Sequence, residues 1–370
     1  MSSLPSLSVC MIVKNEASFL PYTLPSLAEG ADELIVVDTG STDNSVEIAK
    51  QHQAIVSHFE WINDFSAAKN TAIRQASSDW ILMMDADEYI SVDALKTLKT
   101  LIKPNCLIYQ LDKYECKKHE TEPTDISFPR MKVFQNFQNI FYTNPISEQL
   151  THNGSFITNS DHITDPTVYV CHWGGFDALN PKDAKAKRQR YIAHFEALNK
   201  TNPQPEYYFH LANAYYQEKN YSRAINHWKT ITQLSCHDEF IVMAYVKLAS
   251  HYKSTQKDYT TEKQLLQKAI AKSTHYPEPY VDLCLNLIRH NQLQEAKPYA
   301  HHILTLKQSD RITNIDRKHY VFWPYYFLSV IEMSEHNFSA AQHYLDQGLS
   351  HYPKDESLLL LQQSIKKLMG

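Results

Sequence analysis

The sequence contains little glycine, with 7 among 370 residues. Turns use glycine where the backbone takes a positive φ, so the shortage argues against an all-β, turn-rich fold and against a flexible linker chain. The six cysteines are scattered along the chain with no close pairs. This spacing is neither a disulfide framework nor a zinc-ligand pattern, and we expect free thiols in a reducing compartment.

The sequence also lacks long apolar runs and a strong net charge. No apolar run approaches the roughly 20 residues that span a bilayer, and the first residues do not form a charged-then-apolar leader. We therefore expect a cytoplasmic protein without a transmembrane segment, and a peripheral contact with the inner face of the membrane stays open. The formal net charge of -5 gives no electrostatic reason to expect binding to nucleic acid.

The length and composition predict a folded protein with two domains. A chain of 370 residues is too long for one ordinary core, and 43% hydrophobic with 21% charged residues is typical of globular proteins. In the first ninety residues, short apolar runs alternate with helical patterns. The expected strands are 7–13, 34–38, 54–56 and 80–84. Continuous apolar strands separated by helices predict a parallel sheet that is buried on both faces.

Two acidic residues, Asp38 and Asp85, stand where expected strands end. In open α/β sheets, ligands bind outside the carboxyl ends of the strands. Because both acids come to the same edge of one sheet, they predict a shared site. Residues 102–171 mix β-branched, aromatic and polar residues without a clear period, which favours antiparallel strands and loops that close over the sheet. A helical pattern with a basic patch follows at 181–198.

From about Pro205 the sequence repeats as helix-turn-helix units whose packing residues recur at tetratricopeptide spacing. The packing residues of the four units are Tyr208, Leu211, Ala212, Tyr215, Ala224 and Trp228; Tyr245, Leu248, Ala249 and Tyr252; Tyr280, Leu283, Cys284, Leu287, Ala296 and Ala300; and Tyr325, Leu328, Ser329, Ala341, Leu345 and Pro353. One unit cannot bury its own apolar face, so stacking is required. We expect divergent repeats, with extra residues near Lys257 and between Lys307 and Val321, and a capping helix over 356–369.

The acidic run Asp85-Ala86-Asp87-Glu88 follows the apolar strand 80–84. Two carboxylates two residues apart at a strand exit can face one divalent ion and one nucleotide. Oxygen ligands of this kind suit Mg²⁺ or Mn²⁺, which neutralise a diphosphate. A lone Asp-x-Asp is more often an exposed acidic turn, but its position after a buried strand favours a metal-assisted site.

Four ordered motifs strengthen this interpretation. They are Ser8-Val-Cys-Met-Ile-Val-Lys-Asn-Glu, Ala31-Asp-Glu-Leu-Ile-Val-Val-Asp-Thr-Gly-Ser-Thr-Asp, Trp61 with Asp64-Phe-Ser-Ala-Ala-Lys-Asn, and Asp79-Trp-Ile-Leu-Met-Met-Asp-Ala-Asp-Glu. Together they resemble family 2 glycosyltransferases of the GT-A fold, densely over 7–90 and patchily over 128–175. More narrowly, the chain is similar to the branch fused to tetratricopeptide repeats, which includes SunS-type peptide S-glycosyltransferases. The resemblance implies a GT-A domain at 1–178, a helical linker at 179–204 and a repeat domain at 205–370.

The resemblance also implies a nucleotide-sugar site in the first domain. The donor-binding positions are Val13, Asn15, Glu16, Asp38, Lys69, Asn70, Asp85 and Ala86. The first three follow the strand where the family holds the nucleotide base, and Asp38 stands where it contacts the nucleoside, although Asp38 could instead cap the helix that follows. Lys69 replaces the arginine that is frequent in the family, which keeps the charge but loses the bidentate fork.

The metal and the acceptor chemistry rest on a further set of residues. The resemblance implies that Asp87 is the principal metal ligand and that His172 completes the site, although a histidine in this position can also be structural. An inverting transfer needs a base to take the acceptor proton, and Glu148 is our candidate. Ser147 stands where the branch often has histidine, and a thiol acceptor would need less help from a base. Arg130 could contact phosphate or acceptor, or pair with a nearby acid.

Taken together, the sequence predicts an inverting, metal-dependent glycosyltransferase. The expected donor is a nucleoside-diphosphate sugar, a UDP-sugar in the first place, and the cofactor is Mn²⁺ or Mg²⁺. The expected acceptor is a peptide or protein side chain held by the repeats, which could also form a homo-oligomer. Two alternatives stay open: a glycan or lipid-linked acceptor in surface polysaccharide assembly, and a catalytically inactive repeat scaffold.

Overall fold

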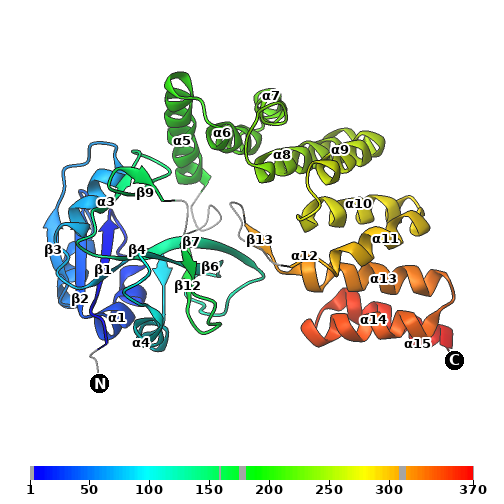
Figure 1. Ribbon diagram of the computed structural model, residues 1–370, viewed down its shortest axis with the longest axis horizontal. Helices are drawn as coiled ribbons and strands as arrows, with labels where there is room; N and C mark the ends of the chain where they lie inside the picture. The colour runs from blue at the N-terminus through cyan, green and yellow to red at the C-terminus, as the bar shows by residue number, and fades with distance from the viewer. Residues whose placement is uncertain (1–3, 158–159, 175–180, 308–313, 370) are drawn as a thin grey trace. The chain divides into compact units, whose positions relative to one another are not determined.

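The computed structural model describes residues 4–157, 160–174, 181–307 and 314–369. It divides the chain into two units, Met1–Asn180 and Pro181–Gly370 (Figure 1). The first unit is built around a mixed β-sheet, and the second consists mainly of helices.

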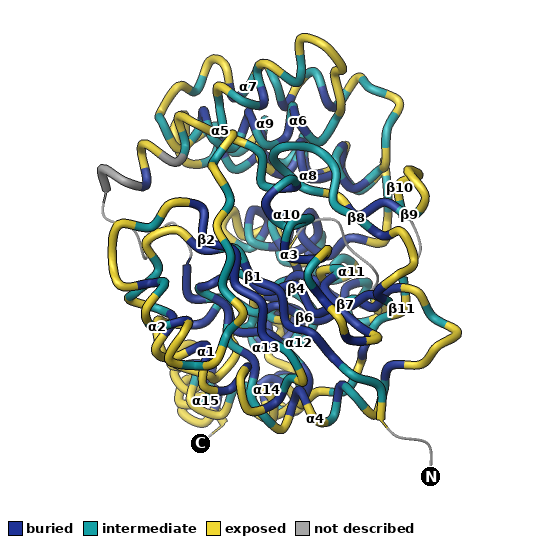
Figure 2. The backbone as a smooth tube through the Cα atoms, turned by 90° about the vertical axis from the view of Figure 1, so that its left-hand side faces the viewer, coloured by how far each residue is buried: buried dark blue, intermediate teal, exposed yellow. Residues whose placement is uncertain are grey.

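Four parallel strands form the first half of the sheet in the first unit. They are β1 (Leu7–Val13), β2 (Glu33–Asp38), β3 (Ile55–His58) and β4 (Trp80–Asp85), in the order β3-β2-β1-β4. Strands β1 and β4 lie inside the unit and are buried along nearly their whole length (Figure 2). The predicted parallel sheet with both faces covered is therefore confirmed, and its strand bounds agree with the sequence to within one or two residues.

Helices cover both faces of this sheet. They are α1 (Leu20–Gly30), α2 (Ser45–Gln51), α3 (Phe65–Ile73) and α4 (Val92–Leu101). The side chains of β1 alternate between the faces, because successive residues of a strand point in opposite directions. Its odd-numbered residues pack in a core with α1 and α4, whereas Cys10 packs with the end of α3.

The sheet continues with the strands β7 (Ile126–Gln135), β6 (Ile108–Glu115), β12 (Tyr169–His172) and β5 (Glu88–Tyr89), in that order beyond β4. Strand β7 is antiparallel to both β4 and β6, and β12 is parallel to β6 but antiparallel to β5. The predicted antiparallel strands are therefore present, but β6 and β7 widen the sheet instead of closing over it. The short β11 (Asp161–His162) also pairs with β6.

A small second sheet lies beside helix α3. It contains β8 (Ile140–Thr143), β9 (Gln149–His152) and β10 (Ser155–Phe156), which pair in antiparallel fashion. The turn between β8 and β9 takes left-handed backbone conformations at Asn144 and Ser147, with φ of 69° and 52°. Because this turn also carries Glu148, the small sheet determines where that carboxylate lies.

The second unit is a stack of antiparallel helix pairs. Its elements are α5 (Pro181–Thr201), α6 (Pro205–Gln217), α7 (Tyr221–Ile231), α8 (Asp238–His251), α9 (Tyr259–Lys272), α10 (Pro277–Arg289), α11 (Leu293–Ile303), the short β13 (Ile315–Asp316), α12 (Lys318–Val321), α13 (Trp323–Ser334), α14 (Phe338–His351) and α15 (Glu356–Met369). The predicted small packing residues Ala212, Ala249, Cys284 and Ser329 are almost fully buried. Among the described helices, none combines the length and the apolar composition that crossing a bilayer requires.

The irregular spacing of the repeats has a visible local cause at the end of α8. The helix continues there into a wider π-type turn, Tyr252–Gln256, which Lys257 ends in a left-handed conformation with φ of 55°. The extra residues predicted near Lys257 therefore form this turn. Of the second predicted insertion, between Lys307 and Val321, residues 308–313 lie outside the described residues.

Candidate functional site

The acidic residues at the strand ends share one edge of the sheet. In the pairing register, Val13 of β1 lies opposite Asp38 of β2, and Ile12 lies opposite Asp85 of β4. Both carboxylates therefore stand at the carboxyl edge of the parallel strands, as the sequence predicts. This is the edge where open α/β sheets bind their ligands.

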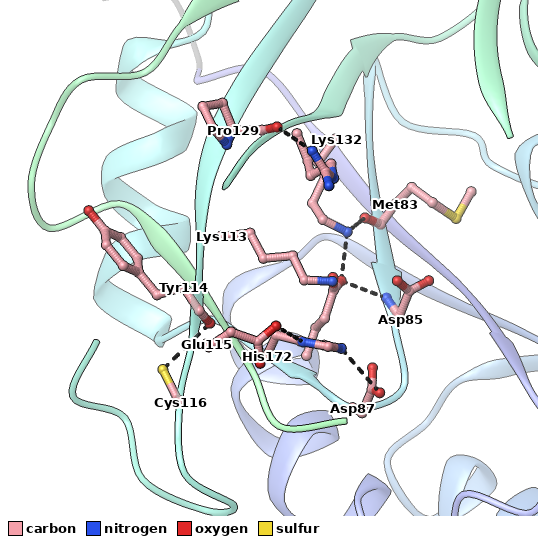
Figure 3. Close-up of polar contacts among 12 residues, drawn as sticks. Met83, Asp85, Asp87, Lys113, Tyr114, Glu115, Cys116, Pro129, Lys132 and His172 are labelled. Carbon is pink, nitrogen blue, oxygen red and sulfur yellow. Dashed lines mark hydrogen bonds and ion pairs between the residues drawn. The ribbon is translucent and has the colours of Figure 1, made fainter. Parts of the chain in front are cut away.

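At this edge, Asp87 lies next to His172, the last residue of β12. The Asp87 Oδ2 atom lies 3.5 Å from His172 Nε2, and both side chains are partly open to solvent (Figure 3). On the other side of the ring, His172 Nδ1 lies 3.1 Å from Glu115 Oε1. Burial by itself lowers the pKa of His172, but the hydrogen bonds to Asp87 and Glu115 outweigh it and raise the pKa to about 9.

Asp87 and His172 fit a divalent cation whose remaining ligands are water molecules and substrate atoms. Their oxygen and nitrogen atoms are close enough to bind one ion, and Mg²⁺ is commonly held by one or two protein groups plus substrate phosphates. The space around the carboxylate also fits, because a Cβ atom on Gly174 would lie only 1.4 Å from Asp87 Oδ2. Within the described parts of the chain, no group of three or more His, Cys, Asp or Glu side chains forms a complete protein cage for a metal.

Glu88 is the last residue of the acidic loop Asp85-Ala86-Asp87-Glu88, and it forms a buried ion triad with two lysines. Its side chain has no exposed surface, and its oxygens lie 2.7 Å from Lys113 Nζ and 2.6 Å from Lys132 Nζ. Glu88 also accepts a hydrogen bond of 2.8 Å from the backbone N–H of Asp85, and Lys132 donates to the Met83 carbonyl (Figure 3). The triad therefore fixes the backbone from which Asp85 and Asp87 project.

Lys69 links the acidic loop to Glu148. Its Nζ atom lies 3.7 Å from Asp85 Oδ1 and 3.2 Å from Glu148 Oε1. Burial tends to raise the pKa of Asp85, but the ammonium groups of Lys69, Lys132 and Lys113 hold that pKa well below its usual range. Burial likewise tends to lower the pKa of Lys69, and the neighbouring Asp85 and Glu148 raise it above its usual range. Two predicted site residues, Asp85 and Glu148, thus lie on either side of the ammonium group of a third, Lys69.

Asp38 shapes the loop that follows β2. Its buried carboxylate accepts hydrogen bonds from the backbone N–H groups of Gly40 and Ser41 and lies 3.1 Å from His58 Nδ1. Burial would raise the pKa of Asp38, but the contacts with Ser41, Gly40 and His58 lower it. The helix that follows begins at Ser45 with Asn44 as its N-cap, so Asp38 does not cap it.

The other predicted donor residues line the same edge in different ways. Asn15 has a left-handed backbone with φ of 59°, and its Oδ1 atom accepts a 2.7 Å hydrogen bond from Thr42 N–H. The Glu16 backbone N–H donates to the Ser45 hydroxyl. Val13 and Ala86 are buried.

Arg130 lies on β7 and is exposed, with its guanidinium 5.1 Å from the centre of the Phe128 ring. It also donates a hydrogen bond to the Pro129 carbonyl. Lys132, two residues further along the same strand, is buried in the ion triad. Arg130 is therefore exposed, whereas Lys132, two residues further along β7, is buried.

Residues 8–161 match the protein-family model described as Glycosyl transferase family 2. The first unit carries a family 2 glycosyltransferase domain. The chain is 35% identical over 196 residues to a TPR repeat-containing protein of Synechococcus elongatus, covering 51% of this chain and 47% of that protein. It is 37% identical over 92 residues to the SPbeta prophage-derived glycosyltransferase SunS of Bacillus subtilis, covering 24% and 22%. The matches thus span about half of the first relative's length and about a fifth of the second's.

Among solved structures, the S. aureus protein TarS, residues 1–349, is 15% identical with a TM-score of 0.37, over 78% of this chain and 92% of that one. Similarity at this level carries no functional argument. The sequence matches support the predicted kinship with the branch of family 2 that is joined to tetratricopeptide repeats.

Three charged residues of the glycosyltransferase domain site were not among the predicted positions: Lys113, Lys132 and Glu115. They lie on β6 and β7, and they contact Glu88 or His172, which are 25 to 57 positions away in the sequence. A possible signal was the presence of charged residues within otherwise apolar strands, since a buried charge is costly unless it is paired. The residues with which they pair could be identified only from the way the strands are paired in the structure.

Asn70 of the glycosyltransferase domain joins helix α3 to strand β8. Its side-chain amide donates to the Tyr142 carbonyl at 2.8 Å and accepts from the Tyr142 N–H at 2.8 Å. We expect Asn70→Asp to destabilise the protein by about 1–3 kcal/mol, because the new carboxylate oxygen would face the Tyr142 carbonyl without a proton between them. Urea unfolding of the variant and the wild type measures the difference. Equal midpoints and slopes would show that this pair contributes little.

Gly174 provides the space that the Asp87 carboxylate occupies. In Gly174→Ala, the added Cβ atom would overlap Asp87 Oδ2, so the carboxylate must turn away from His172. Because a side-chain end moves more easily than backbone, we expect a small loss of stability. We expect the Mn²⁺-dependent affinity for nucleotide to fall at least about 10-fold. Calorimetric titration and thermal unfolding of the same samples separate the two effects, and unchanged affinity would contradict the expectation.

Proposed function

We propose that this protein is an inverting, metal-dependent glycosyltransferase that moves a sugar from a nucleoside-diphosphate donor, a UDP-sugar in the first place, to a peptide or protein side chain. One observation carries the proposal. Asp87 and His172, which are 85 residues apart in the sequence, converge to 3.5 Å at the carboxyl edge of a family 2 glycosyltransferase domain. An oxygen and a nitrogen ligand in this place suit a divalent cation beside a diphosphate.

In this proposal, the residues of the chain divide the work between binding and proton transfer. Asp87 and His172 would hold Mn²⁺ or Mg²⁺, which supplies charge stabilisation to the departing diphosphate. The loop 38–42 and Asn15 stand where the nucleoside would bind. Lys69 orients Glu148 through their 3.2 Å ion pair, so that Glu148 can take the acceptor proton.

The helix pairs of the second unit support the proposal that the acceptor is a peptide or protein. Stacked helix pairs of the tetratricopeptide kind present extended concave surfaces that suit a peptide segment. The chain would then use one unit to bind the donor and the other to bind the acceptor. The tetratricopeptide-containing relative supports a common architecture, but its name says nothing about an acceptor.

Calorimetric titration with UDP, UDP-glucose, UDP-GlcNAc and GDP-mannose, each with and without Mn²⁺, tests the donor site. We expect one nucleotide series to bind in a metal-dependent manner. Product analysis with a peptide library and the donor that binds then tests the acceptor, and the anomeric configuration of the product tests inversion. If none of the four nucleotides binds, the catalytic proposal fails and an inactive scaffold explains the protein better.

A further inference from the structure

His172 stands in the middle of a row of three residues that crosses the sheet. In the strand register, it pairs with Glu88 of β5 on one side and with Glu115 of β6 on the other. Residues directly opposite one another in neighbouring strands lie on the same face of the sheet. Glu88 is already engaged by Lys113 and Lys132, so Glu115 is the acid of this row that contacts the imidazole.

The contacts of the imidazole give its two nitrogens different surroundings. Nδ1 lies 3.1 Å from Glu115 Oε1, whereas Nε2 lies 3.5 Å from Asp87 Oδ2 (Figure 3). The Phe128 ring packs against the imidazole in an edge-to-face arrangement, with 6.5 Å between the ring centroids. The ring is therefore held in one orientation, with Nε2 directed toward Asp87.

We propose that Glu115 is a positioning residue that holds the Nδ1–H of His172, so that Nε2 is presented to a divalent cation beside Asp87. In metal sites generally, a ligating histidine gives its other N–H to a carboxylate or carbonyl, which fixes the tautomer and the ring orientation. The inference rests on the proposed function, because it assumes that a cation binds at Asp87. It adds a residue that is not part of the Asp-Ala-Asp-Glu run or of any of the four sequence motifs.

A purely structural role for Glu115 makes a different prediction. Its side chain is about one-third exposed, at 37%. An ion pair this open to solvent contributes little to folding stability. If Glu115 acts only on stability, its replacement should leave both the metal affinity and the identity of the metal ligands unchanged.

The test uses the full chain with three substitutions. Glu115→Leu removes the acceptor of the Nδ1–H, and Glu115→Gln retains an acceptor oxygen without the charge. Glu120→Gln is the matched control, because Glu120 is an exposed acid in the segment that follows β6, and its carboxylate lies 3.8 Å from Lys117 Nζ. Titration of Mn²⁺ in the presence of UDP or GDP gives the affinity. Electron spin echo modulation from a bound imidazole nitrogen shows whether a histidine is a ligand.

We expect Glu115→Leu to weaken Mn²⁺ binding by roughly 10- to 100-fold and to reduce the nitrogen modulation. Glu115→Gln should recover part of both signals, and Glu120→Gln should match the wild type. The inference is overturned if the wild type binds Mn²⁺ with nucleotide and Glu115→Leu shows the same affinity and the same modulation. If the wild type itself binds no Mn²⁺ with either nucleotide, the proposed function fails and the inference fails with it.

Discussion

Glu88→Gln is expected to destabilise the glycosyltransferase domain by about 3–5 kcal/mol. The substitution keeps the size of the side chain but removes the carboxylate whose oxygens lie 2.7 Å from Lys113 Nζ and 2.6 Å from Lys132 Nζ. Both lysines are almost fully buried, so each ammonium group would lose the carboxylate in direct contact with it where water solvates it poorly. Chemical denaturation followed by tryptophan fluorescence measures the change.

Two further variants show whether the loss arises from the buried charges. Glu29→Gln removes an exposed carboxylate that lies 3.9 Å from Lys96, and we expect it to cost less than about 1 kcal/mol. Adding Lys132→Met to Glu88→Gln removes one of the stranded ammonium groups and should restore part of the stability, because an apolar side chain needs no counterion. If the double variant is less stable than Glu88→Gln, the explanation by stranded charge is wrong.

The first half of the sheet was predictable because its signals are local. Most residues of the strands β1, β2 and β4 are apolar, and Asp38 and Asp85 are the last residues of β2 and β4. The direction of parallel strands then places both acids at one edge without further information. The first repeat was predictable for the same reason, since its packing residues lie within two adjacent helices.

The second half of the sheet was not predictable in the same way. Strands β6 and β7 carry charged residues such as Lys113 and Lys132 among apolar ones, so neither the period of a buried strand nor that of an exposed one is clear. The lysines are tolerated because Glu88 reaches them from β5, a strand of only two residues that gives almost no sequence signal. Glu115 became recognisable only when the register of β6 and β12 placed it beside His172.

Asp87→Asn is expected to lower Mn²⁺-dependent nucleotide affinity by at least about 100-fold and to abolish measurable transfer. Loss of a supporting group near a metal commonly costs 10- to 100-fold, and loss of a charged ligand should cost at least the upper end of that range. Folding should be little affected, because the Asp87 side chain is 23% exposed and its carbonyl still accepts the hydrogen bond from Trp173 N–H. Titration of UDP with and without Mn²⁺ measures the effect.

Asp93→Asn provides the matched control for the Asp87 experiment. It makes the same chemical change at an exposed acid in the first turn of α4, only six residues further along the chain. Asp93→Asn should keep the wild-type titration, and Asp87→Asn should keep the wild-type unfolding midpoint. Together, these two results would assign the loss to the cation site and not to the fold or to the net charge. If Asp87→Asn binds nucleotide with unchanged dependence on Mn²⁺, the cation lies elsewhere, and the roles proposed for His172 and Glu115 must be abandoned too.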